Sequence, residues 1–265
     1  MNDVGSWLRD QRDLPRLDCE LLLGYRLGVS RSHIIAHAEQ SLTAPELSAL
    51  AADTKRLRDD VPLAYITGRR EFWALGLSVT QDVLVPRPET ETLVEQAIGK
   101  ARTGDRILDL GTGCGAIAIA LATSLEAELH ASDHSEAALC IARSNAMRHH
   151  ANIQFSRSDW FAELSGDFHL IVANPPYIAQ DDPHLSALKH EPVAALISGP
   201  DGLDAIRSIV AKAPTYLVPQ GWLLLEHGYD QAARICHLFA VAGFTAIETI
   251  QDLNRQDRVT LGQAR

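Results

Sequence analysis

Residues 107–120 read ILDLGTGCGAIAIA and join a short apolar run, a glycine-rich turn and an alanine-rich segment. The run 107–110 predicts a strand, and the segment that starts at Ala116 predicts a helix. Glycines in the turn between them let the backbone bend sharply and let a ligand approach without a Cβ in the way. Turns of this kind border the ligand crevice of open α/β sheets, so the stretch predicts an α/β fold with a binding site at this turn.

The same alternation continues to the C-terminus. Apolar runs predict strands at 107–110, 128–132, 170–173, 222–225, 244–250 and 258–261. Helical patterns lie between most of them, at 90–102, 115–125, 135–148, 202–213 and 229–242. Strands that alternate with helices predict a doubly wound, mostly parallel sheet covered on both faces. The polar connection from Asp252 to Asp257 is too short for a crossover helix, so the last two strands are predicted to be antiparallel.

The N-terminal part of the chain has a different pattern. Between residues 7 and 60, apolar residues recur at helical spacing and no strand-like run occurs. Thr43 followed by Pro45 predicts the start of a helix. We therefore expect a helical domain over residues 1–70, a hairpin linker over 71–88 and the α/β domain over 89–265.

Composition narrows the class of protein. No apolar run approaches the ~20 residues that a membrane span needs, and the N-terminus has no apolar signal-peptide core. The four cysteines are scattered and the eleven histidines lack metal-ligand spacing, which predicts reduced thiols and no metal. A net charge of −10 argues against a protein that wraps duplex nucleic acid. We expect a cytoplasmic protein.

The glycine turn is compatible with several cofactor classes. A P-loop requires a lysine and a hydroxyl after the glycines, and residues 115–117 supply neither. A nicotinamide fingerprint can be fitted to the turn, but the acid at Asp109 favours a cationic or amino-acid-bearing ligand over a pyrophosphate. Asp133 ends the next strand, where an acid accepts hydrogen bonds from ribose hydroxyls or caps a helix. S-adenosylmethionine fits best, and a structural turn without a ligand is the alternative.

A second motif, Asn174-Pro175-Pro176-Tyr177, ends the strand predicted at 168–173. Two prolines cannot continue a strand ladder, so they stiffen the loop and leave Asn174 over the crevice. A planar NH2 group is a poor nucleophile, and Asn174 Oδ1 and the Pro175 carbonyl can each accept one of its N–H bonds. Tyr177 can pack on a flat substrate. A rigid strand-ending turn is the alternative for Asn-Pro-Pro alone, and we assign no general base.

Together these two motifs resemble those of the class I amino-methyltransferases. Further segments make the chain similar to the peptide chain release factor glutamine N(5)-methyltransferase family, from about residue 15 to the C-terminus. These segments are Pro62–Gly68, Glu71–Trp73, Pro86–Glu91, Glu191–Pro192, Asp201–Leu203 and Glu226–Gly228. Pro86–Glu91 (PRPETE) is the most family-specific of them. The sequence departs from the family at Ser198-Gly199-Pro200, where two glycines are common, and in Asp252–Arg255, which lacks a frequent glycine.

The resemblance implies an S-adenosyl-L-methionine-dependent enzyme with a class I methyltransferase-like, seven-stranded sheet. It would methylate the side-chain amide of the glutamine in the Gly-Gly-Gln motif of class 1 release factors and release S-adenosyl-L-homocysteine. The N-terminal helical domain would dock the release factor. We further expect a monomer, with no membrane partner and no stable nucleic-acid binding.

Site roles follow from the resemblance by position. The methionine end of the cofactor would be held by Gly111, Thr112, Gly113, Cys114 and Gly115. Asp133 would bind the ribose, and Trp160 would border the adenine. The glutamine would be bound by Asn174, Pro175, Pro176 and Tyr177, with Asn174, Pro175 and Tyr177 as the catalytic group and Asn174 also beside the cofactor. Arg87 and Glu89 would order the adjoining loop.

Three other functions remain open at this stage. An enzyme that methylates the exocyclic amine of adenine in nucleic acid uses the same Asn-Pro-Pro-Tyr solution for a planar nitrogen, although it must flip a base and hold a charged backbone. A non-catalytic module that only binds the cofactor would keep the glycine turn. A nicotinamide dehydrogenase is the last alternative.

Overall fold

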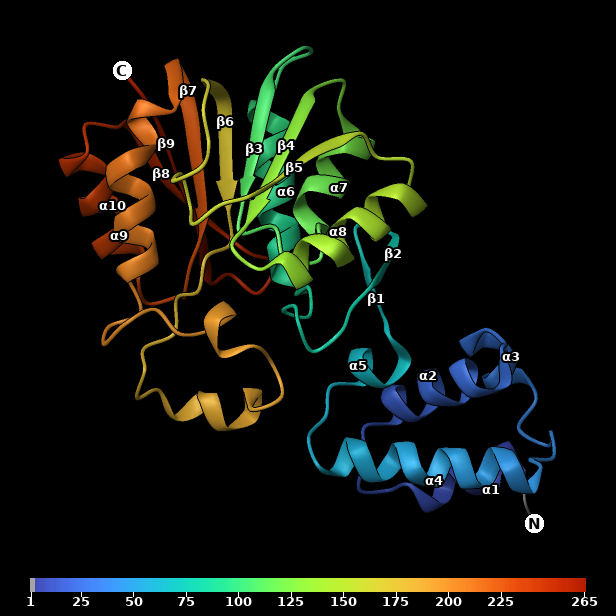
Figure 1. The fold of residues 1–265 in the computed structure, drawn as a ribbon. Coiled ribbons are helices and arrows are strands. Elements are labelled where there is room, and N and C mark those ends of the chain that lie inside the picture. Colours follow the sequence, from blue (N-terminus) through green and yellow to red (C-terminus); the bar gives the residue numbers. More distant parts are fainter. Residues whose placement is uncertain (1–2) are drawn as a thin grey trace. The chain divides into compact units, whose positions relative to one another are not determined.

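The computed structural model describes residues 3–265, which form two compact units. One unit ends at Arg69 and the other covers Arg70–Arg265 (Figure 1). Within the described residues, no helix is both long and apolar enough to cross a membrane.

The first unit is built from helices. They are α1 (Val4–Asp10), α2 (Arg16–Leu27), α3 (Arg31–Ala36), α4 (Ala44–Arg58) and α5 (Leu63–Thr67). Their core contains Val4, Leu8, Leu22, Leu23, Ile34 and Leu50. Helix α4 begins as the sequence predicts, because Thr43 and Glu46 form a capping box in which each side chain accepts the other's backbone N–H.

The second unit opens with a hairpin of β1 (Arg69–Phe72) and β2 (Leu75–Ser78). The elements that follow are the 3₁₀ turn η1 (Pro88–Thr90), α6 (Glu91–Lys100), β3 (Arg106–Leu110), α7 (Ala116–Ser124), β4 (Glu128–Asp133), α8 (Glu136–Arg148), β5 (Ile153–Arg157) and β6 (Phe168–Ala173). The last are η2 (Pro183–Leu188), η3 (Val193–Ala195), α9 (Asp204–Lys212), η4 (Ala213–Thr215), β7 (Leu217–Glu226), α10 (Ala232–Val241), β8 (Thr245–Gln251) and β9 (Asp257–Gln263).

The sheet has seven strands in the order β5-β4-β3-β6-β7-β9-β8. All neighbours are parallel except β9, which pairs antiparallel with both β7 and β8. The predicted fold class is confirmed, including the antiparallel pair at the C-terminus. Strand β5 was missed among the sequence-predicted strands. It lies at the sheet edge, and its residues are half-buried or exposed, so it lacks a continuous apolar run.

Helices cover both faces of this sheet (Figure 1). Successive side chains of a strand point to opposite faces. On β3, Leu108 and Leu110 share a core cluster with Ile206 of α9 and Phe239 of α10. Asp109, between the two leucines, accepts the backbone N–H of Ala118 of α7 and so faces the other side.

The topology brings both sequence motifs to one edge of the sheet. From β3 the chain runs outward through β4 to β5 and then returns to β6 on the other side of β3. Leu110 is opposite both Ser132 of β4 and Ala173 of β6. The glycine turn, Asp133 and Asn174 therefore follow the carboxyl ends of three adjacent strands, at the switch point where α/β sheets bind ligands.

A buried side chain of α8 connects this edge to the hairpin. Asn145 is fully buried; its Nδ2 donates to the Cys114 carbonyl at 2.9 Å and to the Ser78 carbonyl at 3.0 Å. Its Oδ1 accepts the Ser78 N–H at 2.8 Å. One amide thus satisfies three backbone groups and fixes the glycine turn against β2.

We predict that Asn145→Ala lowers the free energy of unfolding by about 2 to 4 kcal/mol, because buried backbone groups lose their partners. Urea unfolding followed by circular dichroism measures the change. Asn152→Ala is the matched control: Asn152 is exposed, and we expect a change within about 0.5 kcal/mol. Equal changes in the two variants would contradict the cross-linking role of Asn145.

Candidate functional site

The glycine turn after β3 holds its backbone open toward a cavity. The amides of Gly111 and Thr112 both donate to the Ser132 carbonyl, at 2.8 and 2.9 Å. Gly111 and Gly113 have φ of +73° and +55°, a region that favours glycine. A Cβ on Gly113 would meet no atom within 4 Å, so its backbone faces open space.

Gly115 has a different task in the same turn. Its φ is +86°, and a Cβ there would lie 3.0 Å from Ile119 Cδ1 and 3.2 Å from Ala142 Cβ. It therefore permits close packing of α7 on α8. Gly115 is absent from the cavity lining, whereas Gly111, Thr112, Gly113 and Cys114 belong to it.

Asp109 does not face a ligand, contrary to what the sequence suggested. Its side chain is fully buried below the turn, where Oδ2 accepts from the Thr112 hydroxyl at 2.6 Å and from the Ala118 amide at 3.2 Å. Oδ1 has no hydrogen-bond partner among the described residues. Burial raises the pKa of Asp109 to about 7, because the charged form loses its hydration. The carboxyl group therefore supports the turn from within the protein.

Asp133 and Trp160 lie next to the turn and line the same cavity. Asp133 accepts the Gly113 amide on Oδ2 and the Ser135 amide on Oδ1, each at 2.9 Å. A carboxylate offers about four lone-pair sites, so both oxygens keep acceptor capacity. The Trp160 ring lies against the turn, and a Cβ on Gly111 would come within 3.5 Å of it.

Three adjoining cavities meet here. The main cavity is lined by the glycine turn, Asp133, Trp160, Asn174 and Pro176, among others. The Trp160 cavity shares Gly111, Asp133, His134 and Trp160 with it. The Tyr177 cavity is lined by Leu84, Arg87, Asn174, Pro175, Tyr177, Ile178, Leu188, Ala195 and Leu196. Asn174 belongs to both the main cavity and the Tyr177 cavity, so it lies where the two cavities meet.

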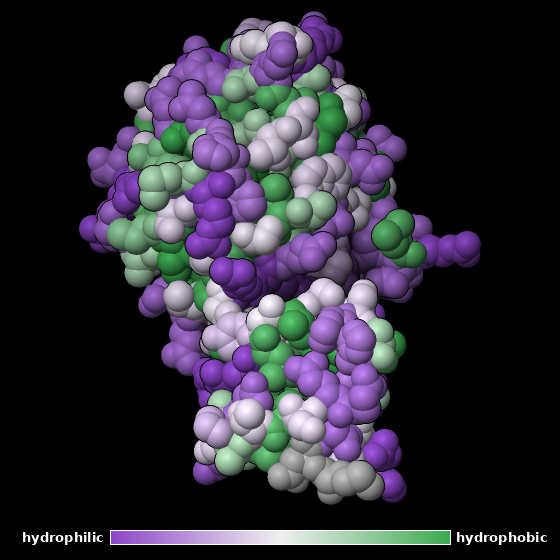
Figure 2. Space-filling view, turned by 90° about the vertical axis from the view of Figure 1, so that its right-hand side faces the viewer, coloured by the Kyte–Doolittle hydropathy of each residue, from purple (hydrophilic) through white to green (hydrophobic). Residues whose placement is uncertain are grey.

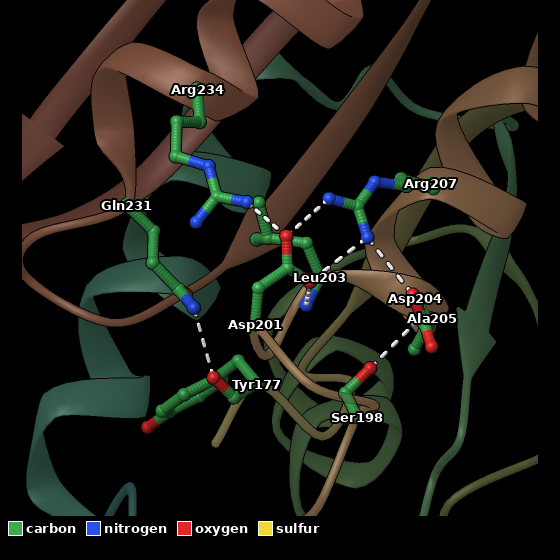
Figure 3. A network of polar contacts seen from close by, with 9 residues as sticks. All are labelled: Tyr177, Ser198, Asp201, Leu203, Asp204, Ala205, Arg207, Gln231 and Arg234. Atoms are coloured by element: carbon green, nitrogen blue, oxygen red, sulfur yellow. Dashed lines mark hydrogen bonds and ion pairs between the residues drawn. The ribbon is translucent and has the colours of Figure 1, made fainter. Parts of the chain in front are cut away.

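The Asn174–Tyr177 loop is held by residues far away in the sequence. Gln231 Nε2 donates to the Tyr177 carbonyl at 2.9 Å (Figure 3), and its Oε1 accepts the Gly228 amide. Gly202 packs so closely that a Cβ there would be 2.3 Å from the Tyr177 carbonyl oxygen. The loop therefore has little freedom to move away from the cavities.

An ion-pair network stabilises the segment that contains Gly202. Arg207 of α9 and Arg234 of α10 both point at Asp201 (Figure 3). Arg207 also donates to Asp204, and the Ser198 hydroxyl accepts the Ala205 amide at 2.8 Å. Hydrogen bonds from Arg207 and Arg234 hold the pKa of Asp201 well below its usual range. Asp201 thus connects α9, α10 and the loop under Tyr177.

The segment Pro86–Glu91 borders the place where the main cavity and the Tyr177 cavity meet. Arg87 lines both adjoining cavities and forms an ion pair with the buried Glu191, which also accepts the Val85 amide at 3.1 Å. Thr90 accepts a hydrogen bond from Asn174 Nδ2 at 3.2 Å. Arg87 therefore lies where the two cavities meet, and Glu89 is absent from the linings of these three cavities.

Burial of the cysteine in the site disfavours covalent catalysis by its thiol. Burial raises the pKa of the Cys114 thiol to about 12, so the nucleophilic thiolate is scarce near neutrality. Burial also raises the pKa of the Tyr177 hydroxyl. Within residues 3–265, no group of three or more His, Cys, Asp or Glu side chains is arranged to hold a metal. The site can bind, orient and desolvate two ligands side by side.

Four supporting residues escaped sequence reasoning as site residues: Thr90, Asn145, Glu191 and Gln231. Asn145 and Gln231 carry no local pattern and contact the site only through the fold. Glu191 and Thr90 lie inside the quoted segments Glu191–Pro192 and Pro86–Glu91, so that part of the resemblance could have indicated them.

Comparison with known families gives two matches. A family model described as PrmC N-terminal domain matches residues 4–68. A second, described as Methyltransferase small domain, matches residues 89–195 and includes both sequence motifs.

Curated relatives match nearly the whole chain. The release factor glutamine methyltransferase of Xylella fastidiosa (strain 9a5c) is 46% identical over 257 residues, 94% of this chain and 94% of that protein. Proteins with the same name from Coxiella burnetii and Escherichia coli K12 are 46% and 43% identical and cover 98% and 97% of this chain. The matches cover 96% and 97% of those two proteins.

Solved structures share the fold. A methyltransferase from Pyrococcus furiosus superposes with a TM-score of 0.59 at 16% identity, over 80% of this chain and 98% of that one. A 16S rRNA N2 G1207 methyltransferase (RsmC) from T. thermophilus, in complex with AdoMet and guanosine, gives 0.55 at 20% identity, over 74% and 50%.

We predict that Asp109→Asn stabilises the protein more at about pH 8 than at about pH 4.5. The folded-state pKa of Asp109 is raised to about 7, above its usual 3.8, so its ionisation costs stability as pH rises between these values. The difference amounts to roughly 3 to 4 kcal/mol and is read from thermal unfolding at both pH values. Asp167→Asn is the control, since Asp167 is exposed. An equal effect of Asp109→Asn at both pH values would contradict the prediction.

Proposed function

This chain belongs to the release factor glutamine methyltransferase family, and we propose the methyl donor and the acceptor atom of its reaction. It transfers a methyl group from S-adenosylmethionine to the side-chain amide nitrogen of the glutamine in the Gly-Gly-Gln motif of class 1 release factors. The observation that carries the proposal is the position of Asn174, which lines both the main cavity and the Tyr177 cavity.

The main cavity and the Trp160 cavity fit the cofactor. The open backbone at Gly113 and the gap between Gly111 and Trp160, which a Cβ would fill, leave space for a ligand beside the turn. Gly111, Thr112, Gly113 and Cys114 would hold the methionine end, and the free acceptor capacity of Asp133 suits a ribose diol. Trp160 would cover the adenine. Gly115 would not contact the cofactor, and it would support binding only by shaping the turn.

The Tyr177 cavity would hold the glutamine side chain. When bound, S-adenosylmethionine supplies an electrophilic methyl group. Asn174 Oδ1 and the Pro175 carbonyl accept the two N–H bonds of the substrate amide, which fixes its nitrogen and orients the π-face toward the methyl group. The same hydrogen bonds stabilise the positive charge that develops as nitrogen forms its new bond, and one proton then leaves nitrogen.

Pro176 and Tyr177 complete the arrangement. Pro176 lines the main cavity, and the prolines keep the loop extended at the sheet edge. The Tyr177 ring would pack on the flat amide, while Leu84, Ile178 and Leu196 supply apolar walls that exclude water. Positioning and desolvation therefore account for the rate without a general base.

Methylation of an adenine amine in nucleic acid is not favoured. The family relation points to a protein glutamine, and the net charge of −10 opposes a phosphate backbone. We further propose that the enzyme acts as a monomer in the cytoplasm and binds nucleic acid only weakly.

We predict that wild-type enzyme with methyl-labelled S-adenosylmethionine labels unmethylated release factor and leaves DNA and RNA unlabelled. Asn174→Ala lowers kcat about 100- to 1000-fold, because an acceptor for the substrate amide is lost. A release factor whose motif glutamine is changed to alanine takes up no label. Label on nucleic acid and none on release factor would overturn the substrate assignment and leave the cofactor assignment standing.

The helical unit would dock the release factor. Helix α2 exposes Leu17, Leu21 and Tyr25, which are spaced four residues apart and share one helix face. Their exposed fractions are 49%, 41% and 46%. Figure 2 shows hydrophobic side chains at the surface of this unit. Contiguous exposed apolar residues of this kind mark protein-binding surfaces.

We predict that the triple change Leu17→Ser, Leu21→Ser and Tyr25→Ser raises KM for release factor by about 10-fold or more and leaves kcat within about twofold. Steady-state kinetics with saturating S-adenosylmethionine separate the two constants. Val241→Ser on α10 is the matched control, since Val241 is an exposed apolar residue of the other unit. An unchanged KM in the triple variant would exclude this face as the docking surface.

A further inference from the structure

The carboxamide of Asn174 is held from behind by Thr90. Asn174 Nδ2 donates to Thr90 Oγ1 at 3.2 Å, across a sequence separation of 84 residues. Thr90 is buried, with 4% of its surface exposed, and it ends η1 in the segment Pro86–Glu91. The contact engages the amide nitrogen and leaves Oδ1 as the free end of the side chain.

The orientation of this amide matters because its two ends have nearly the same shape and opposite chemistry. Oδ1 accepts hydrogen bonds, whereas Nδ2 donates them. An Asn174 side chain turned end for end would present N–H groups to the N–H groups of the substrate amide. The reaction therefore needs a contact that distinguishes the two orientations.

The Thr90 hydroxyl can make this distinction because it carries a single hydrogen. The buried Glu226 carboxylate lies near it, and the Thr90 hydroxyl favours the charged form of that carboxylate. An ionised carboxylate only accepts, so it attracts the Thr90 hydrogen. Thr90 Oγ1 then only accepts from Asn174, which selects the orientation with Nδ2 toward Thr90.

Glu226 ends β7 and is 1% exposed. Its Oε1 accepts from the Tyr177 hydroxyl at 3.5 Å, and its Oε2 has no hydrogen-bond partner within residues 3–265. Burial raises the pKa of Glu226 to about 7, and the negative charge of Glu89 adds to the rise. Thr90, Arg258 and Tyr177 oppose it. Arg258, on β9, also forms an ion pair with Asp252, with 3.1 Å between Nε and Oδ2.

We propose that Thr90 is a positioning residue for methyl transfer: with its hydrogen donated to Glu226, it keeps Asn174 Oδ1 directed at the substrate amide. The inference rests on the proposed function, since it concerns the side chain that receives the glutamine.

The same geometry makes the orientation depend on pH. Protonated Glu226 donates its own hydrogen to Thr90 Oγ1, and the Thr90 hydrogen is then free to turn toward Asn174. That arrangement favours the reversed amide. Because the pKa of Glu226 is raised to about 7, the productive orientation prevails above this pH and is lost as pH falls below it.

The kinetic test compares Thr90→Val with Thr90→Ser. Valine keeps the shape and loses the hydroxyl, so we expect kcat to fall about 10- to 100-fold while the dissociation constant of S-adenosylmethionine stays within about twofold. Serine keeps the hydroxyl, and we expect kcat within about threefold of wild type. Equal losses in both variants would assign Thr90 a packing role and overturn the proposal.

The pH test uses Glu226→Gln, which cannot ionise. Below about pH 7, wild-type kcat should fall by up to about tenfold per pH unit, and the variant should show a flat profile. If Glu226 only supported the fold, Glu226→Gln would change the free energy of unfolding and leave the pH dependence of kcat in place. A variant that keeps the wild-type profile would overturn the assignment of Glu226.

A third readout needs no substrate and separates this inference from the proposed function. The side-chain NH2 signals of Asn174 are followed by NMR in enzyme saturated with S-adenosylmethionine, between about pH 6 and about pH 8. We expect a shift in wild type that is absent in Glu226→Gln and Thr90→Val. Wild-type enzyme that shows this shift and fails to methylate release factor would refute the substrate alone. Identical signals in all three proteins would refute the positioning role.

Discussion

The parallel register of β3 and β6 places Leu110 opposite Ala173, and each of these residues is the last of its strand. The glycine turn after Leu110 and the loop that starts at Asn174 therefore begin side by side. A shift of one residue would move every side chain of β3 to the other face and bring Asp109 into the apolar cluster under α9 and α10. The apolar pairing of β3 with β6 thus brings the two loops together, independently of the polar contacts around them.

The strands that form this pairing, and the points where they end, could be predicted from the sequence. The apolar runs of β3, β4 and β6 and the prolines after Ala173 are local patterns, and local patterns determine strands and their ends. Strand β5 escaped because an edge strand needs no continuous apolar run. The face of Asp109 was also beyond the sequence. Both sides of β3 are buried, so alternation of polarity does not distinguish them.

The supporting contacts could not be predicted because they join segments that only the fold brings together. Asn145 reaches Ser78 across 67 residues, Gln231 reaches Tyr177 across 54, and Asn174 reaches Thr90 across 84. Each contact satisfies a backbone group or orients one side chain. None requires a repeating pattern, so a single sequence carries no signal for the pairing.

Two buried carboxyl groups follow a common plan at this edge. Asp109 accepts the Thr112 hydroxyl under the glycine turn, and Glu226 lies beside the Thr90 hydroxyl that contacts Asn174. In each group one oxygen has no hydrogen-bond partner in the described part of the chain. Burial raises the pKa of both groups to about 7. Such groups lower stability. A neutral side chain could fill the same space, but it would leave the direction of the neighbouring hydroxyl hydrogen undetermined. Each carboxylate can instead orient a neighbouring hydroxyl, and that hydroxyl orients the loop it contacts. This role explains why an unfavourable buried charge is present at both positions.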